Sequence, residues 1–379
     1  MKANLLRRAL LNNGHLPHLL TMPQIRPPTP YFPEQQLNLH RIEPPRPLHG
    51  VYLDGLLSHL KEADPYRKFV EENRRRRASV PLEGKNLLDY ALTTPALPYT
   101  RRKEEGKVDV IRKLTGHDTA RGGGPKLLVC KGNGLQSITG GQADTVLLKI
   151  YDPMCYPFTD PRPRDIVVDA ENDFTVEAAA YAYLDPHIGG KFIPKYYGSF
   201  VFSMPNPQQQ GLPSQPAGLR QVFAVAIEFV EGDPLSHLKS ADYSEAQRMR
   251  VMGKAVKGYT MIRHHQVRHN DLAPRNIMTS TKDFNSEKLR ISFLDLDAAE
   301  VLPLLKGTLP PKPPKPESPI KLFWDDIPSE MQETGWVSRE WTEEKWNAWL
   351  VRTFLGDKEF DHESSEWKGW ARENLRQLH

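Results

Sequence analysis

The stretch Val267–Met278 places an acid and an amide where both could act on one phosphate. Asp271 and Asn276 lie five residues apart, and His269 precedes them. In phosphoryl transfer a carboxylate accepts or orients the proton of the acceptor hydroxyl, and a nearby carboxamide oxygen binds Mg²⁺ close to the transferred group. The spacing therefore predicts a catalytic loop, with Asp271 as the base and Asn276 as a metal ligand.

A second acidic motif follows the catalytic loop in the sequence. The apolar run Leu289–Leu294 ends in Asp295-Leu-Asp297. A short buried strand that ends in a carboxylate would deliver that group to a metal ion. Each motif alone is a weak signal, but their order and separation together favour a metal-binding loop with Asp295 as a ligand.

A single cation, Lys149, interrupts the apolar strand predicted over Thr145–Tyr151. An unpaired buried lysine would be costly, so Lys149 is expected to face a partner or a ligand phosphate. The alternative is an edge-strand lysine that reaches water. A helix predicted over 172–184, with Asp173 as its cap, offers Glu177 as the partner. Glu177 could also be an ordinary exposed glutamate.

Two further stretches could contact a nucleotide. Gly132-Asn-Gly134 separates the short apolar run Lys126–Cys130 from the strand of Lys149, and glycines allow close approach of a backbone to phosphates. The spacing fits a plain hairpin turn equally well. The predicted strand Gln221–Val230 runs into Glu228–Gly232, which is typical of a hinge whose backbone could meet an adenine edge.

Taken in order, these elements resemble the protein-kinase-like superfamily. The resemblance implies ATP and Mg²⁺ as cofactors. It implies that Lys149, paired with Glu177, holds the α- and β-phosphates, that Asp271 is the catalytic base, and that Asn276 and Asp295 bind the metal. The other residues expected at the nucleotide are Gly132, Gly134, Glu228 and Val230.

The same resemblance implies an α+β, two-lobed protein-kinase-like fold. A small N-lobe with an antiparallel sheet and an αC helix is expected over 121–228. A mainly helical, shortened C-lobe is expected over 229–379, where the C-terminal tryptophans would pack the lower lobe. Residues 1–120 are expected to be a Pro-rich, basic and largely disordered extension with a helical stretch near 53–77.

The departures from the superfamily pattern bear on the substrate. Asn270 replaces the usual Arg before the catalytic Asp, the metal motif is Asp-Leu-Asp, and no Ala-Pro-Glu motif follows. The pattern is closer to the aminoglycoside and choline phosphotransferase branch, which acts on small hydroxylated or aminated substrates. Ala273 stands where peptide kinases commonly carry Lys, so Arg275 is expected to supply the charge at the γ-phosphate. The alternative is that Arg275 pairs with a carboxylate and holds the loop in shape.

Composition separates a basic N-terminal part from a nearly neutral body. Residues 1–80 hold 13 Lys and Arg against seven acids, a net charge of +6, and the whole chain carries +4, which leaves −2 for the rest. A body of negative charge disfavours nucleic acid as the partner. The Pro-rich segment 23–47 is expected to be an extended tether or the ligand of a PPII-binding partner.

Targeting signals favour an intracellular, cytoplasmic or nuclear protein. The only cysteines are Cys130 and Cys155, no apolar run approaches the ~20 residues that a membrane span requires, and Arg74–Arg77 could address the nucleus or simply end a solvated helix. The first 33 residues lack acids, so a mitochondrial leader is an alternative to a frayed tail.

Two functions remain open. The chain is predicted to be an ATP- and Mg²⁺-dependent phosphotransferase whose acceptor is a hydroxyl of a protein or of a small molecule. The alternative is a pseudokinase or scaffold that keeps the fold and transfers nothing, which the weak glycine loop and the short activation segment favour.

Overall fold

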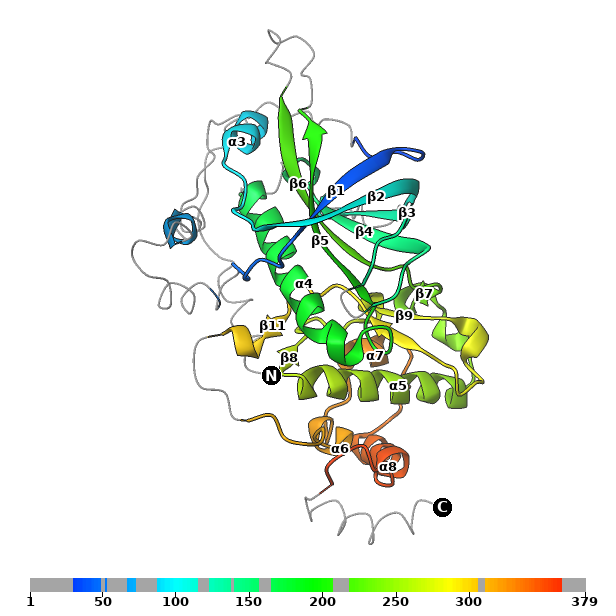
Figure 1. Cartoon of the computed structure of the whole chain (residues 1–379). Coiled ribbons are helices and arrows are strands. Elements are labelled where there is room, and N and C mark those ends of the chain that lie inside the picture. Colours follow the sequence, from blue (N-terminus) through cyan, green and yellow to red (C-terminus); the bar gives the residue numbers. More distant parts are fainter. Residues whose placement is uncertain are drawn as a thin grey trace, which may run out of the picture.

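The computed structural model describes residues 30–48, 52, 67–72, 87–114, 123–137, 140–156, 165–206, 218–305 and 311–362 (Figure 1). The acid-free N-terminal segment up to residue 29, the Arg74–Arg77 cluster, Trp367 and Trp370 lie outside the described residues. Of the predicted helical stretch 53–77, residues 67–72 are described, and they are helical.

Six strands form a closed antiparallel barrel in the order β1-β2-β3-β4-β6-β5. All six strands contribute to one buried apolar cluster, with Leu39, Val108 and Phe200 among its members, so this cluster is the barrel interior. Side chains alternate across a strand. The strands are β1 Gln36–Ile42, β2 Arg101–Lys113, β3 Lys126–Lys131, β4 Thr145–Tyr151, β5 Tyr196–Pro205 and β6 Leu219–Glu228.

Closure of this barrel contradicts the expected two-lobed protein-kinase-like fold, and that fold prediction is wrong. The strand β1 pairs antiparallel with both β2 and β5, so it satisfies both edges that an open sheet would expose. Its side chains Leu37 and Leu39 point into the interior. Both β1 and β2 lie before residue 121 and within the segment expected to be a disordered extension. The barrel therefore begins well before that boundary.

The long helix α4, Ile166–Ile188, packs against the outside of the barrel and separates it from the rest of the chain (Figure 1). Asp165 caps its N-terminus by accepting hydrogen bonds from the amides of Val167 and Val168. Asp173, the expected cap, lies inside the helix, which begins earlier than the sequence pattern indicated. Ala178–Ala180 are buried, and their small side chains allow close packing.

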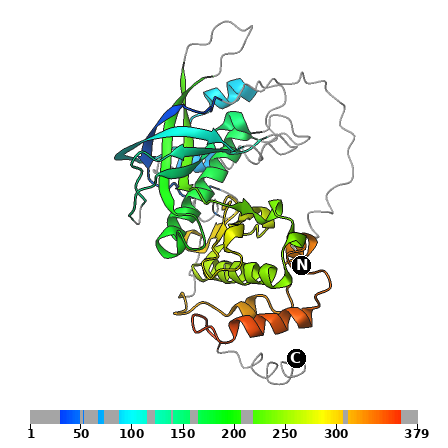
Figure 2. The same cartoon turned by 90° about the vertical axis from the view of Figure 1, so that its right-hand side faces the viewer.

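The part beyond the barrel combines helices with two small sheets, which also departs from the expected mainly helical C-lobe. Ser244 and Gln247 form the capping box that opens α5, as their spacing predicted. Figure 2 shows α8 at the end of the molecule far from the barrel. The helices are α3 Leu87–Thr93, α5 Glu245–His264, α6 Pro319–Leu322, α7 Ser329–Glu333 and α8 Glu343–Phe354. One sheet contains β10 Ile291–Phe293, β9 Ile277–Thr279 and β7 Asp233–Pro234, and the other contains β11 Glu300–Val301 and β8 Val267–Arg268.

The tryptophans within the described residues pack this part of the chain, as expected. Trp336 and Trp346 are fully buried. Their indole N–H groups donate to the carbonyl oxygens of Leu235 and Phe323, at 3.1 and 2.8 Å. None of the helices in the described part of the chain is both long and apolar enough to cross a bilayer.

Candidate functional site

Lys149 lies on the outer face of the barrel, where it meets α4. Alternation along β4 turns Val146 and Leu148 inward and leaves Lys149 on the other face. Its Nζ is 2.6 Å from Oε2 of Glu177 on α4 and 2.5 Å from Oδ1 of Asp295. The structure thus brings together three predicted site residues that are far apart in the sequence.

Glu177 is held rigidly in this ion pair. It is buried, and its Oε2 accepts a hydrogen bond from the hydroxyl of Tyr151 as well as the contact from Lys149. Oε1 of Glu177 is buried with no hydrogen-bond partner among the described residues. Burial raises the pKa of Glu177, and the Lys149 ammonium only partly opposes this rise.

Carboxylates outnumber cations around Lys149. Burial alone would lower the pKa of Lys149, but Asp295, Glu177 and Asp297 raise it well above its usual value, so the ammonium stays charged. Burial, and then repulsion from Asp295, raise the pKa of Asp297 well above its usual value. Burial also raises the pKa of Asp173 to about 7. Glu177 is buried and Asp173, Asp295 and Asp297 are partly buried, so a further cation would lower the electrostatic repulsion among them.

Asp271 has both carboxylate oxygens engaged within its own loop. Oδ1 accepts from Nη2 of Arg275 at 2.5 Å, and Oδ2 accepts from Nδ2 of Asn276 at 2.9 Å. A 3-10 turn over Pro274–Asn276 brings these partners back onto the acid, and proline at its first position favours that turn. The spacing of five residues that marked this loop is therefore the spacing of a direct side-chain contact.

Three hydrogen bonds join the catalytic loop to the loop of Asp295. The ring of His269 bonds through Nε2 to the Leu294 carbonyl at 2.9 Å, and the Leu294 amide donates to the Asn276 carbonyl at 2.8 Å. Nδ2 of Asn270 donates to the Ala298 carbonyl at 3.1 Å. Burial lowers the pKa of His269, so the ring is neutral and donates through Nε2.

The backbone at the two ends of this junction is strained. Asn270 and Asp295 both have φ of 61°, in the left-handed region that side chains other than glycine rarely adopt. Such conformations cost about 1–3 kcal/mol each and persist where the surroundings impose them, often at functional sites. The hydrogen bonds between the two loops supply that restraint and fix where the Asp295 carboxylate points.

The residues present fit a magnesium ion. Nδ2 of Asn276 donates to Asp271, which leaves its Oδ1 as an acceptor, and Asp295 is joined to the same loop through Leu294. Across the described ranges, no three His, Cys, Asp or Glu side chains gather in a way that could hold a metal ion. Mg²⁺ is usually held by one or two carboxylates together with substrate phosphates, so a complete protein cage is not needed.

At the expected hinge, the Glu228 side chain has a structural partner. Its carboxylate accepts two hydrogen bonds from the guanidinium of Arg290, at 2.5 and 2.8 Å, and a third from the Lys195 amide at 3.1 Å. The Glu228 amide donates to the Lys195 carbonyl at 2.8 Å, which leaves the backbone after Glu228, up to half-buried Val230, for a ligand. Gly232 has φ of 133°, and a Cβ there would lie 2.2 Å from the Thr279 carbonyl oxygen, so the hinge requires glycine.

Gly132 and Gly134 are not brought to the site. The register pairs Leu127 with Lys149 and Lys131 with Thr145, so the glycine turn lies at the other end of the β3–β4 hairpin. Four residues of strand separate the two ends by about 13 Å. The Gly132 amide donates a hydrogen bond to the backbone carbonyl of Asp144 across that turn. The structure thus shows a hairpin turn at these glycines, and their contact with phosphates stays a prediction.

Four side chains were not predicted to belong to the site, although three of them had a positional signal. Tyr151 stands two residues after Lys149 on the same strand face, and Asp297 stands two residues after Asp295. Asp173 precedes Glu177 by one helical turn, and Tyr156 donates to its carboxylate at 2.9 Å.

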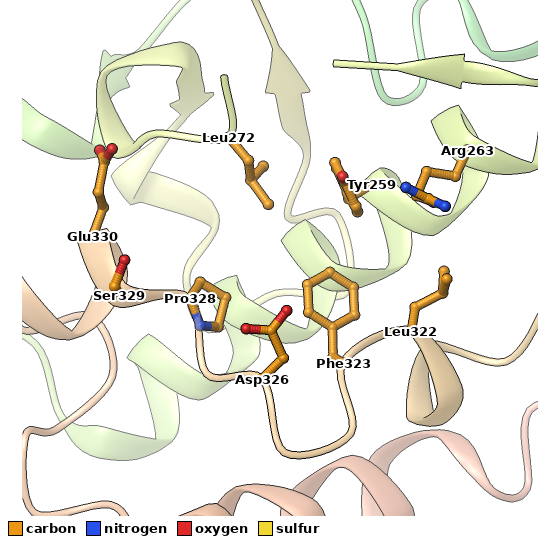
Figure 3. Close-up of a pocket in the computed structure, with 9 residues that line it drawn as sticks. All are labelled: Tyr259, Arg263, Leu272, Leu322, Phe323, Asp326, Pro328, Ser329 and Glu330. Atoms are coloured by element: carbon orange, nitrogen blue, oxygen red, sulfur yellow. The ribbon is translucent and has the colours of Figure 1, made fainter. Parts of the chain in front are cut away.

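A cavity of about 400 Å³ adjoins the catalytic loop (Figure 3). Arg275 connects it to Asp271, because the same guanidinium lies 2.5 Å from Asp271 and 3.5 Å from Glu330, a residue of the cavity wall. The lining residues are Tyr259, Arg263, Leu272, Leu322, Phe323, Asp326, Pro328, Ser329 and Glu330.

No protein-family model matches this chain, and no curated protein matches it. What the site can do therefore has to follow from its own residues.

Proposed function

We propose that this chain is a phosphotransferase that moves the terminal phosphoryl group of ATP, with Mg²⁺, to a hydroxyl. One observation carries the proposal. Lys149 is held between Glu177 and Asp295 at 2.6 and 2.5 Å, and the loop of Asp295 is hydrogen-bonded to the loop that holds Asp271 and Asn276. This arrangement supports Lys149 as the phosphate-binding cation, Asn276 and Asp295 as metal ligands and Asp271 as the base.

In this proposal Lys149 binds the phosphates and α4 holds it in place. Glu177 and Tyr151 fix the ammonium from one side. The contact between Lys149 and Asp295 is the one that would break when ATP binds. Lys149 would then contact phosphate oxygens, and Asp295 would contact the metal. Bound Mg²⁺ would shield the phosphate charge, and Asn276 and Asp295 are the residues that would hold it.

Asp271 is the proposed base and Arg275 the proposed charge at the transferred phosphoryl group. Asp271 must free one oxygen to accept the proton of the acceptor hydroxyl. Arg275, which is half exposed, is the partner that can leave, whereas Asn276 is buried. A guanidinium that moves from the carboxylate to the γ-phosphate would uncover the base and stabilise the negative charge of the transition state.

The hinge backbone is the proposed contact for the adenine edge. The Glu228 side chain is occupied by Arg290, so the contact falls to main-chain groups between Glu228 and Val230. An intracellular location, cytoplasmic or nuclear, is part of the same proposal. It is supported by Cys130 and Cys155, which are both buried and form no disulfide.

A second candidate function, a nucleotide-binding scaffold without transfer, is favoured by one observation. Both oxygens of Asp271 are bound by residues of their own loop. A scaffold would keep that arrangement with ATP present, and nucleotide would then bind without any product being formed.

Mass spectrometry of products from labelled ATP, screened over small hydroxyl compounds and generic proteins, separates the two functions. Lys149→Met should abolish product formation, whereas the matched control Lys131→Met changes an exposed lysine of the neighbouring strand and should not. ATP binding without any labelled product would favour the scaffold. Equal turnover in wild type and Lys149→Met would contradict the phosphotransfer proposal.

A further inference from the structure

We propose that Tyr52 is a positioning residue. Its hydroxyl fixes the far end of the loop that carries Asp295, and so keeps the Asp295 carboxylate where it can bind a metal ion. The inference rests on the proposed function for the role of Asp295. Its structural part, that Tyr52 holds this loop, stands on the contacts between Tyr52 and β11.

The hydroxyl of Tyr52 completes the edge of β11 that faces away from β8. It donates to the Ala299 carbonyl at 3.0 Å and accepts from the Val301 amide. The Leu302 amide donates to the Gln266 carbonyl on the β8 side, and successive amides along a strand point to opposite edges. The Ala299 carbonyl and the Val301 amide therefore face away from β8, and one hydroxyl takes the place of a third strand there.

A buried tyrosine hydroxyl suits this task. Tyr52 is 3% exposed, and burial raises the pKa of Tyr52 to about 12, so the hydroxyl keeps its proton and can donate. A buried backbone N–H or C=O group without a partner costs about as much as a lost hydrogen bond. The Tyr52 hydroxyl pairs with one group of each kind, which a phenylalanine in its place could not do.

The loop that Tyr52 holds is the strained one. Hydrogen bonds from the catalytic loop fix its beginning and its middle, whereas β8 and Tyr52 fix its end. Asp295 has φ of 61°, a conformation that persists only where the surroundings impose it. If the end of the loop is released, Asp295 can relax and move away from Lys149, which is now 2.5 Å away.

The stretch that carries Tyr52 also contacts α4. The Leu48 amide donates to Oγ1 of Thr175 at 3.2 Å, two residues before Glu177 on the helix. Leu48 and Tyr52 are both buried in the core cluster that includes residues of α4 and β11. Two residues four positions apart therefore contact both elements that supply a carboxylate to Lys149.

Hydrogen exchange of the full chain without nucleotide tests the structural part. Tyr52→Phe removes the hydroxyl and keeps the ring. Backbone amides from Leu294 to Ala299 should then exchange about tenfold faster than in wild type, since one buried hydrogen bond shifts an opening equilibrium by about that factor. The matched control is Tyr31→Phe, because the Tyr31 hydroxyl is also buried and donates to Asp152 at 2.7 Å in the barrel interior. It should leave the exchange of this loop unchanged.

Metal affinity tests the functional part. At a fixed saturating concentration of ATP, Mg²⁺ is titrated and the melting temperature is recorded. Tyr52→Phe should need about tenfold more Mg²⁺ to reach half of the full rise, as is usual when a residue that orients a metal ligand is lost. Tyr31→Phe should keep the wild-type midpoint. A residue that only stabilised the fold would lower the melting temperature without nucleotide and leave the Mg²⁺ midpoint unchanged.

Loop exchange at the wild-type rate in Tyr52→Phe, or an equal acceleration in Tyr31→Phe, would overturn the inference. An unchanged Mg²⁺ midpoint in Tyr52→Phe, with a wild type that responds to MgATP, would overturn it as well and leave the proposed function standing. Faster loop exchange in Tyr52→Phe, with a wild type that does not respond to MgATP, would defeat the proposed function and leave Tyr52 as the residue that holds the loop.

A second variant covers the case in which Tyr52→Phe does not fold. Thr175→Val keeps the shape of the side chain and removes the acceptor of the Leu48 amide. It should loosen the same stretch and speed exchange in the Asp295 loop. Loop exchange at the wild-type rate in Thr175→Val would then overturn the inference.

Discussion

Replacement of Lys149 by Met should lower the free energy of unfolding, because the carboxylates around it lose their positive partner. Glu177 and Asp295 would lose the ammonium that lies 2.6 and 2.5 Å away, and Glu177 is buried, so water cannot take its place. Removal of one partner of a buried ion pair costs about 3–5 kcal/mol. For a chain of this size, this corresponds to a fall in the melting temperature of roughly 6–20 °C.

The loss of stability in Lys149→Met should depend on pH. Burial already raises the pKa of Glu177 above its ordinary value of 4.5, and Lys149 is the group that opposes this rise. Without Lys149 the pKa rises further in the folded state. A carboxyl whose pKa is raised by folding is stabilising below its unfolded pKa, and that contribution is lost as the pH rises through the folded pKa. The stability gap between wild type and variant should therefore be largest near pH 7.5 and should narrow toward pH 5.

Urea unfolding at pH 7.5 and pH 5 measures this gap, with Lys131→Met as the exposed-lysine control. In the double variant Lys149→Met/Glu177→Gln the orphaned charge is gone, so part of the lost stability at pH 7.5 should return. A gap that stays the same at both pH values, or a Lys149→Met variant within about 0.5 kcal/mol of wild type, would refute this account of the ion pair.

Three other changes have defined outcomes. Asp271→Asn keeps the shape of the side chain, so it should fold normally and lower the phosphotransfer or ATPase rate by about 10²–10⁴-fold; unchanged turnover would point to a different base. Arg275→Lys should keep ATP affinity and lower turnover, with a stability change under about 1 kcal/mol because Arg275 is half exposed; a loss of several kcal/mol with normal turnover would assign Arg275 a structural role. Burial, and then Lys312, His187 and His264, lower the pKa of His265 to about 3. Thermal stability should therefore fall as the pH drops from about 6.5 toward about 3, and His265→Gln should flatten that slope; an unchanged slope would mean that other groups control it.

The local part of the site could be predicted from the sequence. The contact between Asp271 and Asn276 spans five residues of one loop, so a motif in the sequence is sufficient to find it. Lys149 was identifiable because a lone cation in an apolar strand needs a partner, and Glu177 is that partner.

The barrel could not be predicted, because its closure depends on pairing between distant segments. The strand β1 lies among prolines, and its partners β2 and β5 are far away in the sequence. The place of the glycine turn relative to Lys149 also depends on strand pairing. Gly132 and Gly134 are close to Lys149 in sequence, but strand direction places them at the opposite end of the hairpin. Asp173 is not the cap, because the helix already begins after Asp165, whose side chain accepts the first free amides.

The melting temperature with and without MgATP tests the central claim most directly. A ligand that binds only the folded protein at about 100 times its Kd adds about 2.7 kcal/mol, which corresponds to a rise of roughly 5–10 °C for a chain of this size. The account predicts this rise for wild type and a much smaller one for Asp295→Asn, which removes a charge that we propose holds the metal. If saturating MgATP leaves the melting temperature of the folded wild-type protein unchanged, the site around Lys149 does not bind nucleotide, and the proposed function is wrong.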